Sequence, residues 1–194
     1  MKTDIVLAGV GGQGILTIAT ILGAAALKDN LYLKQAEVHG MSQRGGDVQS
    51  NLRISSEPIH SDLIALGGAD LSVSLEPMEA LRYLPFLAKE GWIVTSTVPF
   101  VNIDNYPEME KVTAELNSHP RVVAFDMDET AKEVATARSS NLVLLGAASP
   151  FIDIDPDKIE DAIRNVFGAK GEKIVESNIA AFRAGREIAK GYIS

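Results

Sequence analysis

Two glycine-rich segments hold most of the residues whose types and spacing could do chemistry. The first is Gly9-x-Gly11-x-x-Gly14, which follows the apolar run Ile5–Ala8 and precedes a stretch rich in Leu, Ile and Ala. Glycine permits positive φ and close approach of a ligand to the backbone, and a helix start offers unpaired N–H groups. The alternative is a tight turn that packs helix against strand without a ligand. We predict a phosphate-type anion site that comprises Gly9, Gly11, Gly12, Gln13 and Gly14.

The second segment begins at Glu37, where a dinucleotide-binding domain would place the acid that ends its second strand. Residues 38–47 then combine an imidazole, a hydroxyl, an amide, a guanidinium and three glycines. An ordinary nicotinamide-binding domain has no need for so many donors here, so we predict a second binding loop. Its predicted cofactor-binding residues are Glu37, Gly40, Ser42, Gln43, Arg44, Gly45 and Gly46, and His39 is the candidate catalytic residue.

Each side chain of the second loop has a functional and a structural interpretation. Arg44 offers a planar fork for phosphate or carboxylate, or it forms a salt bridge with Glu37 or Asp47. His39 donates a hydrogen bond or moves a proton near neutral pH, or it only orients the loop. The pair at 45–46 forms an anion-binding nest or a plain turn. The whole segment could also be a subunit interface without ligand contacts.

A β–loop–α–β unit must position both segments. Ile5–Ala8 reads as a buried strand, the following helix ends near Lys28, and 31–36 reads as a second strand. If the two strands are parallel, both loops lie at the carboxyl edge of the sheet, where open α/β sheets bind ligands. We therefore expect residues 9–14 and 37–46 to meet at one edge.

The rest of the chain predicts one α/β domain over residues 1–194, without repeats or linkers. The strand 48–54 has period-two alternation, which favours a half-exposed and antiparallel strand. The segment 38–47 is expected to be a loop. Further strands are expected at 71–75, 92–96 and 121–125, and helices at 77–87, 107–117, 130–137, 141–148, 156–167 and 172–192.

Composition excludes several classes of function. The 18 Lys and Arg against 26 Asp and Glu give a formal charge of −8, which argues against a duplex nucleic-acid binder. The absence of cysteine excludes disulfides, thiolate metal sites, Cys-ligated clusters and a Cys nucleophile within the chain. The apolar stretch Ile15–Leu27 is shorter than the ~20 residues that span a bilayer. We expect a cytoplasmic protein with no membrane partner.

Other polar residues are weaker candidates. Glu76 and Glu79 fit the first turn of a helix, where acids complement the dipole. The segment 126–129 is expected to be an acidic turn with an N-cap, with a metal site as its alternative. His60 and His119 lie in separate polar segments without partners of metal-ligand spacing. We predict no metal site in this chain.

The two loops carry a resemblance to a known family. Gly9-Val10-Gly11-Gly12-Gln13-Gly14 and Glu37-Val38-His39-Gly40-Met41-Ser42-Gln43-Arg44-Gly45-Gly46 resemble the gamma-type subunit of 2-oxoacid:ferredoxin oxidoreductases, and the form of 38–46 is similar to the indolepyruvate type. The segments 75–81 and 141–147 also resemble that family. The resemblance implies a three-layer α/β/α sandwich with a mixed, mostly parallel sheet and a Rossmann-like start.

The resemblance also implies an enzyme subunit that is inactive alone. The family decarboxylates a 2-oxoacid oxidatively with thiamine diphosphate and coenzyme A and passes electrons through iron–sulfur clusters to ferredoxin. This chain lacks a Gly-Asp-Gly diphosphate–magnesium motif and cysteines. Thiamine diphosphate, Mg²⁺ and 4Fe-4S clusters are therefore expected in one or more large partner subunits, ferredoxin is expected to reach the chain only through the complex, and coenzyme A is a ligand that the loops could contact.

The substrate and two other classes of function stay open at this point. The form of 41–46 favours an aryl pyruvate such as indolepyruvate, while pyruvate, 2-oxoglutarate and branched-chain 2-oxoacids are the alternatives. A free-standing NAD(P)-binding domain is a second candidate, and a purely structural scaffold within a complex is a third.

Overall fold

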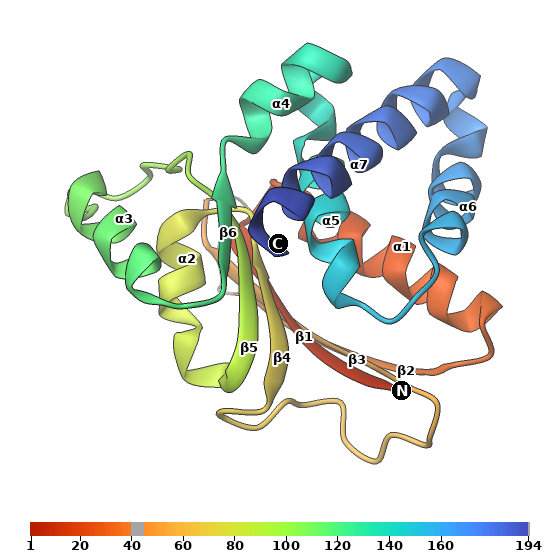
Figure 1. Ribbon diagram of the computed structural model, residues 1–194, viewed down its shortest axis with the longest axis horizontal. Coiled ribbons are helices and arrows are strands. Elements are labelled where there is room, and N and C mark those ends of the chain that lie inside the picture. The colour runs from red at the N-terminus through yellow and green to blue at the C-terminus, as the bar shows by residue number, and fades with distance from the viewer. Residues whose placement is uncertain (40–44, 194) are drawn as a thin grey trace.

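The computed structural model describes residues 1–39 and 45–193, which build one six-stranded mixed sheet (Figure 1). The strand order is β2-β3-β1-β4-β5-β6. The run β1-β4-β5-β6 is parallel, and only β3 runs against its neighbours β1 and β2. The predicted mixed, mostly parallel sheet is confirmed. Its strands are β1 Lys2–Val10, β2 Tyr32–His39, β3 Asp47–Ser55, β4 Ala69–Ser74, β5 Leu87–Ser96 and β6 Val122–Phe125.

Helices cover the two faces of the sheet unequally. One face carries α1, α4, α5, α6 and α7, and the other carries α2 and α3 beside β4 and β5 (Figure 1). This arrangement is the predicted α/β sandwich. The helices are α1 Ile15–Lys28, α2 Pro77–Arg82, α3 Met109–Ser118, α4 Met127–Val134, α5 Ser140–Ala148, α6 Pro156–Phe167 and α7 Glu172–Ile193, and short 3₁₀ turns include η1 Leu84–Phe86, η2 Ala137–Ser139 and η4 Gly168–Lys170.

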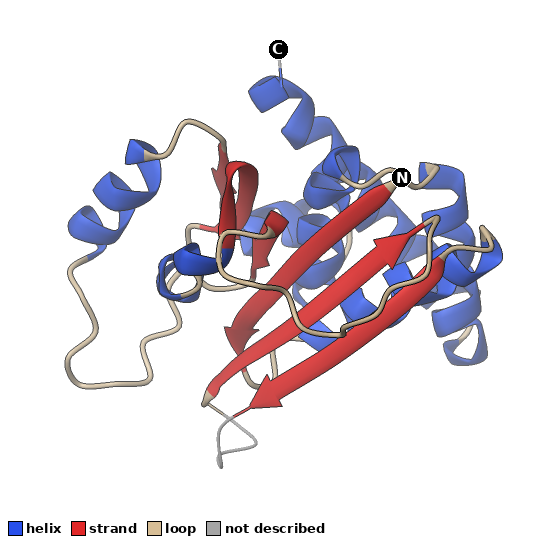
Figure 2. Cartoon of the chain, turned by 90° about the horizontal axis from the view of Figure 1, so that it is seen from below, coloured by secondary structure: helices blue, strands red, loops and turns tan. Residues whose placement is uncertain are grey.

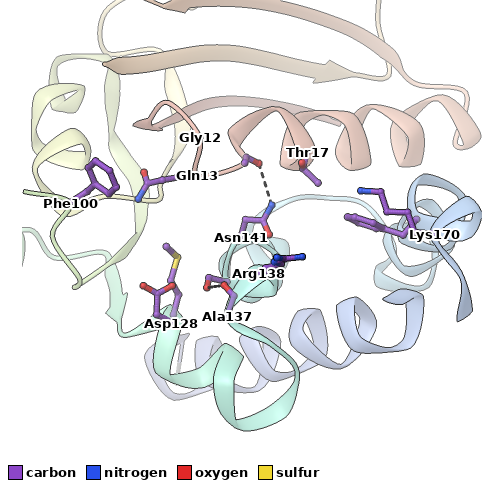
Figure 3. A pocket seen from close by; sticks show the side chains of 13 residues that line it. Gly12, Gln13, Thr17, Phe100, Asp128, Ala137, Arg138, Asn141 and Lys170 are labelled. Atoms are coloured by element: carbon purple, nitrogen blue, oxygen red, sulfur yellow. Dashed lines mark hydrogen bonds between the residues drawn. The ribbon is translucent and has the colours of Figure 1, made fainter. Parts of the chain in front are cut away.

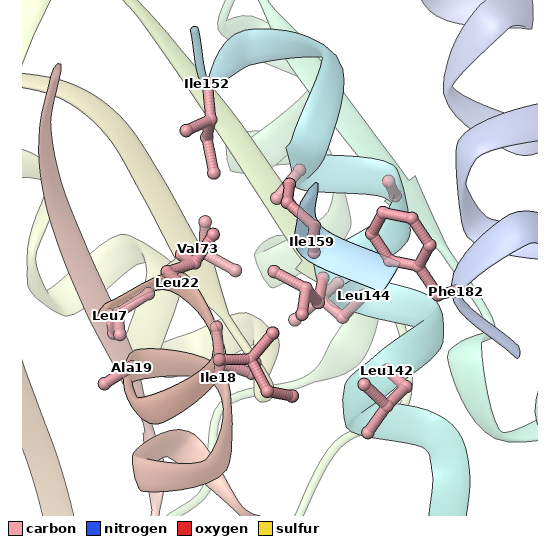
Figure 4. Packing of buried hydrophobic residues seen from close by; sticks show 14 of the residues in the cluster. Leu7, Ile18, Ala19, Leu22, Val73, Leu142, Leu144, Ile152, Ile159 and Phe182 are labelled. Atoms are coloured by element: carbon pink, nitrogen blue, oxygen red, sulfur yellow. The ribbon is translucent and has the colours of Figure 1, made fainter. Parts of the chain in front are cut away.

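The main hydrophobic core lies between the sheet and the five-helix face. Leu7 and Val73 on neighbouring strands pack toward Ile18 of α1 and Leu144 of α5 (Figure 4). Every residue of α5 is buried, as the apolar run 141–148 predicted. A helix that is apolar all round must be enclosed on all sides, and α5 is enclosed by the sheet, α1, α4 and α7.

Two glycines allow α5 and α7 to approach at backbone distance. A Cβ atom added to Gly146 would lie 1.9 Å from the carbonyl oxygen of Phe182, and one added to Gly185 would lie 1.9 Å from that of Val143. No side chain fits at either position without moving a helix. The two glycines therefore fix how α5 sits against α7.

The predicted half-exposed character of β3 is wrong. Its antiparallel direction is confirmed, but most of its residues are buried on both faces. The segment 56–68 crosses the outer face of the strand (Figure 2). There Arg53 donates from Nη1 to the carbonyls of Ser61 and Leu63 at 2.9 and 3.2 Å, and Ile64 N donates to Asn51 Oδ1 at 3.4 Å. Asn51 and Arg53, two of the polar residues that produced the alternation, thus bind a covering segment of the chain.

Several predicted boundaries also differ from the structure. The helix expected over 77–87 ends at Arg82, and Pro85 and η1 turn the chain so that Leu87 begins β5. β2 extends to His39, so Val38 and His39 belong to a strand and not to the expected loop. The helix expected to begin at Thr130 begins at Met127, because Asp126 caps it by accepting from the N–H groups of the next turn.

Candidate functional site

The two glycine-rich loops meet at the carboxyl edge of the sheet. β1 and β2 run in the same direction with β3 between them, so both strands end at this edge. Gly11 N donates to Gly46 O at 2.8 Å, and Gly45 N donates to Gly11 O at 3.4 Å. The prediction that these segments share one edge is confirmed for residues 9–14, 45 and 46. We call this edge, formed by residues 9–14, 45–46 and 97–106, the rim.

Gln13 holds the first loop in place. Its Oε1 accepts from Val10 N at 2.7 Å, and its Nε2 donates to Leu75 O at 3.2 Å. The side chain therefore joins the end of β1 to the segment after β4. Binding of a cofactor by Gln13 stays a prediction, but the structure shows that both polar ends of its amide are hydrogen bonded within the chain.

The end of the first loop presents the start of α1. Gly14 is the N-cap with φ of 94°, a left-handed conformation that favours glycine, and no side chain caps the helix there. The first turn holds no acidic residue. The unpaired N–H groups of this turn and the positive end of the helix dipole are therefore not neutralised by a carboxylate from the helix itself.

A third segment, residues 97–106, joins the rim through the buried acid Glu76. The Glu76 side chain is fully buried, and its Oε2 accepts from Glu79 N at 2.8 Å as the N-cap of α2. Its Oε1 accepts from Phe100 N at 3.3 Å and from the Tyr106 hydroxyl. The carboxylate thus holds this segment at Phe100 and at Tyr106. The sequence indicated only a dipole complement here, and no spacing rule would have revealed the two distant donors.

The same segment contacts the second glycine loop. Asn102 donates from Nδ2 to Gly45 O, so residues 97–106 and 45–46 are hydrogen bonded to each other. Burial, and then the hydrogen bond to Glu76, raise the pKa of Tyr106, so its hydroxyl stays a donor at neutral pH. Three segments that are distant in sequence therefore form one hydrogen-bonded rim.

Charged and hydroxyl side chains of α2 and its C-cap residue Tyr83 lie beside the rim. Burial raises the pKa of Glu79, and the hydrogen bond from Arg82 Nε at 2.8 Å opposes that rise. The Tyr83 hydroxyl donates to Asp47 Oδ2 at 3.1 Å, and burial together with this bond raises the pKa of Tyr83. These residues tie the start of β3 to α2.

A cavity of about 510 Å³ opens next to the first glycine loop (Figure 3). Gly12 and Gly14 line it from the loop and Thr17 from the first turn of α1. The opposite walls come from the segments around η2, α5 and η4, through Arg138, Asn141 and Lys170. Sequence analysis did not identify these three residues as site candidates, because Arg138 and Lys170 lie in short turns without a motif of fixed spacing, and the family resemblance of 141–147 pointed to no ligand.

The predicted site residues fall into two groups. The structure places Gly9, Gly11, Gly12, Gln13, Gly14, Gly45 and Gly46 at the rim, and Glu37 near the end of β2, opposite Ser50 of β3. His39 ends β2 opposite Val48. Their ligand-binding roles stay predictions. Gly40, Ser42, Gln43 and Arg44 lie outside the described residues.

The weaker candidates have structural roles or none. Asp126 Oδ1 accepts from Asp128 N and Glu129 N at 2.9 and 2.8 Å, which confirms the expected N-cap. Across residues 1–39 and 45–193, no group of three His, Cys, Asp or Glu side chains could hold a metal ion. In the same ranges, no helix is long and apolar enough to cross a membrane.

Comparison with known proteins identifies relatives along the whole chain. Residues 4–188 match the family described as pyruvate ferredoxin/flavodoxin oxidoreductase. The chain is 37% identical to indolepyruvate oxidoreductase subunit IorB of Thermococcus kodakarensis, covering 96% of each chain. It is 34% identical to 2-oxoglutarate synthase subunit KorC of Methanocaldococcus jannaschii, covering 98% of this chain and 95% of that one.

A solved structure agrees with these relatives. The 2-oxoglutarate:ferredoxin oxidoreductase of Magnetococcus marinus, with 2-oxoglutarate, coenzyme A and succinyl-CoA bound, matches 98% of this chain with a TM-score of 0.76 and 25% identity. The match spans 31% of that longer chain, so a domain of this fold is there part of a larger polypeptide. This chain therefore belongs to the pyruvate ferredoxin/flavodoxin oxidoreductase family, and it is a small subunit of the 2-oxoacid:ferredoxin oxidoreductase type.

Proposed function

We propose that this chain is the small, non-autonomous subunit of an indolepyruvate-type 2-oxoacid:ferredoxin oxidoreductase in the cytoplasm, folded as a single domain. The observation that carries the proposal is the end-to-end similarity to subunits named for indolepyruvate, at 37% identity over 96% of both chains. The similarity to a 2-oxoglutarate synthase subunit at 34% identity makes 2-oxoglutarate the first alternative substrate. Pyruvate and branched-chain 2-oxoacids follow.

The proposed reaction converts a 2-oxoacid, coenzyme A and oxidised ferredoxin to acyl-CoA, CO₂, a proton and reduced ferredoxin. Thiamine diphosphate, when bound to the complex, would supply the electron sink for decarboxylation, and iron–sulfur clusters would supply the electron path to ferredoxin. This chain has no cysteine to ligate a cluster. The large partner subunit is therefore proposed to hold these groups with Mg²⁺, and ferredoxin meets that partner.

The task of this chain is proposed to be binding and orientation at the rim. The hydrogen bonds between Gly11 and Gly46, and between Asn102 and Gly45, hold residues 45–46 against the first loop and against the segment 97–106. We propose that this edge faces the catalytic partner and the phosphates of coenzyme A.

Co-expression with the large subunit tests the assignment. We expect a complex with the visible absorbance of iron–sulfur clusters, and ferredoxin reduction with indolepyruvate that exceeds the rates with 2-oxoglutarate, pyruvate and a branched-chain 2-oxoacid. The isolated chain should be inactive with all four. A chain that forms no complex with such a subunit would refute the assignment, and a preference for another oxoacid would replace only the substrate.

The variant Arg44→Ala tests the role of the rim within that complex. We expect turnover to fall about tenfold, because a charge-assisted pair is lost at the proposed anion contact. The matched control is Arg183→Ala, which removes a guanidinium paired with Glu160 at 2.7 Å between α6 and α7. Equal turnover in both variants would assign Arg44 a structural role only.

A further inference from the structure

The buried acid Glu76 makes more contacts than the capping of a helix requires. It is 0% exposed, and one oxygen, Oε2, accepts from Glu79 N at 2.8 Å at the start of α2. Short side chains such as Ser, Thr, Asp and Asn are the usual N-caps, because one nearby oxygen is sufficient. Among the residues that the structure describes, no Lys, Arg or His forms an ion pair with Glu76. Burial of a carboxyl group without a cation is costly, so the longer side chain indicates a second task.

The second oxygen of Glu76 holds the segment 97–106 at two points. Oε1 accepts from Phe100 N at 3.3 Å and from the Tyr106 hydroxyl. All residues of this segment are described, and none of them belongs to a helix or strand. A segment without the regular hydrogen bonds of a helix or sheet depends on such side-chain contacts for its position. Glu76 therefore determines where the segment lies relative to α2.

The segment 97–106 connects Glu76 to both glycine loops. Asn102 lies between the two residues that Glu76 binds, and its Nδ2 donates to Gly45 O. Gly45 N donates in turn to Gly11 O at 3.4 Å, and Gly11 N donates to Gly46 O at 2.8 Å. A continuous series of hydrogen bonds thus leads from a buried carboxyl group on α2 to the loop that precedes α1.

Phe100 connects Glu76 to the cavity beside the first loop. Its N–H group is bound by Glu76, while the residue is 43% exposed and lines the cavity. Figure 3 shows its ring on the same side of the cavity as Gln13. An exposed aromatic side chain keeps a defined position only where its backbone is held. The shape of the cavity on this side therefore depends on Glu76 as well.

We propose that Glu76 is a positioning residue of the enzyme, which fixes the segment 97–106 through Phe100 and Tyr106 and thereby fixes the two glycine loops relative to each other through Asn102. In this role Glu76 acts through other residues and touches no reacting group. The inference rests on the proposed function, because it takes the rim as the edge that meets the catalytic partner and coenzyme A. A rim that is held in place before binding lowers the entropic cost of binding.

Amide hydrogen exchange in the isolated full-length chain, followed for single residues by NMR, tests the structural part of this proposal. Glu76→Ser keeps a preferred N-cap for α2 but is too short to reach the segment 97–106. Tyr106→Phe removes one hydroxyl donor and leaves the cap of α2 unchanged. We expect exchange at Gly11 N and Gly45 N to rise about tenfold in Glu76→Ser and about threefold in Tyr106→Phe.

Matched substitutions elsewhere are the controls for hydrogen exchange. Glu110→Ser changes an exposed acid in the first turn of α3, and Tyr192→Phe removes a hydroxyl that donates to Ala124 O at 2.9 Å. Neither should alter exchange at Gly11 or Gly45. Exchange at both glycines that stayed unchanged in Glu76→Ser and in Tyr106→Phe would overturn the proposal.

Steady-state kinetics of the complex with the large subunit test the functional part. We expect Glu76→Ser and Asn102→Ala each to raise the KM for coenzyme A about fivefold, because both release the rim. The KM for the oxoacid and kcat at saturating coenzyme A should stay within about twofold of the native values, because the reacting groups lie on the partner. An unchanged KM for coenzyme A in both variants would overturn the positioning role. A native chain that forms no active complex would instead refute the proposed function, and hydrogen exchange would still decide whether Glu76 fixes the rim.

Discussion

Two buried carboxyl groups, each paired with an arginine, lie near opposite edges of the sheet, and their pKa values are shifted in opposite directions. Near the amino edge, Asp4 of β1 is bound by Arg53 of β3 through two bonds, Nε to Oδ1 at 2.8 Å and Nη2 to Oδ2 at 3.0 Å. Beside the rim, Glu79 is bound by one nitrogen of Arg82 within the same helix. Burial raises the pKa of both acids, but at Asp4 the hydrogen bonds from Arg53 and Lys2 outweigh it and lower the pKa.

The difference teaches how the fold divides its electrostatics. The side chains of Asp4 and Glu79 are similarly shielded, at 5% and 3% exposure. Asp4 faces two cations, whereas Glu79 has one cation and the nearby carboxylates Glu76 and Asp47, which also raise its pKa. The negative charge of Asp4 at the amino edge is thus balanced by two cations, whereas negative charge is concentrated beside the rim at the carboxyl edge.

The largest expected effect comes from removing Arg53, and the same substitution at Arg82 supplies the comparison. Arg53→Met should lower the free energy of unfolding by about 3 kcal/mol, because it leaves Asp4 buried beside Lys2 alone and releases the carbonyls of Ser61 and Leu63. Arg82→Met should cost about 1 kcal/mol, because that guanidinium is half exposed and makes one bond. Urea denaturation measures both values. Equal losses would break the comparison.

Glu76 provides a third buried carboxylate for this comparison. Its oxygens accept hydrogen bonds from N–H and O–H groups rather than from an arginine. Glu76→Ala should cost about 2 kcal/mol by orphaning the donors of Glu79, Phe100 and Tyr106. Hydrogen exchange should then increase across residues 97–106. Glu108→Ala is the control, because Glu108 is an exposed N-cap of α3 without a side-chain capping bond. Unchanged exchange in the Glu76 variant would show that the acid does not fasten this segment.

The contribution of Asp4 to stability should decrease as pH falls. Its pKa lies below the ordinary value of 3.8, so its stabilising effect is present above about pH 4 and is lost as pH falls through the lower folded pKa. The difference in unfolding free energy between the native chain and Asp4→Asn should therefore shrink as pH decreases from 6 toward 2. A constant difference would show that the ion pair adds nothing beyond its neutral hydrogen bonds.

The smallest expected effect is the pH dependence of stability that Glu79 contributes, which has the opposite sign to that of Asp4. Its pKa lies above the ordinary value of 4.5, so its contribution to stability is greatest below that pH and declines as pH rises through the folded pKa. Glu79→Gln should remove this decline, which a series of urea melts between pH 4 and 7 would reveal. If the variant and the native chain kept parallel profiles, the carboxyl edge would be as well compensated as the amino edge.

Sequence reasoning succeeded where a local pattern has one structural solution. The apolar run 5–8, the buried helix 141–148 and the Asp155 cap followed by Pro156 were predicted in the right elements. The meeting of the two glycine loops followed from strand direction alone. These features depend on periodicity, capping and strand direction, which can be inferred from short stretches of sequence.

The failures occurred where distant segments satisfy polar groups. Arg53 and Asn51 read as solvent-facing residues until the segment 56–68 is seen to cover them. Glu76 read as an ordinary first-turn acid because Phe100 and Tyr106 lie more than twenty residues away. The cavity residues Arg138 and Lys170 belong to separate turns that only the packing of α5, α6 and α7 brings together.

The glycine contact between α5 and α7 has a consequence far from itself. Asn141 and Gly146 lie on the same short helix, and a Cβ atom added to Gly14 would lie 2.6 Å from Asn141 Nδ2. The distance between the first glycine loop and the Asn141 amide thus depends on how closely α5 packs against α7, at a contact more than one helical turn away from Asn141. A side chain at Gly146 or Gly185 would force α5 and α7 apart and would therefore move the part of the cavity wall that Asn141 forms, so the shape of the cavity depends on a contact in the interior.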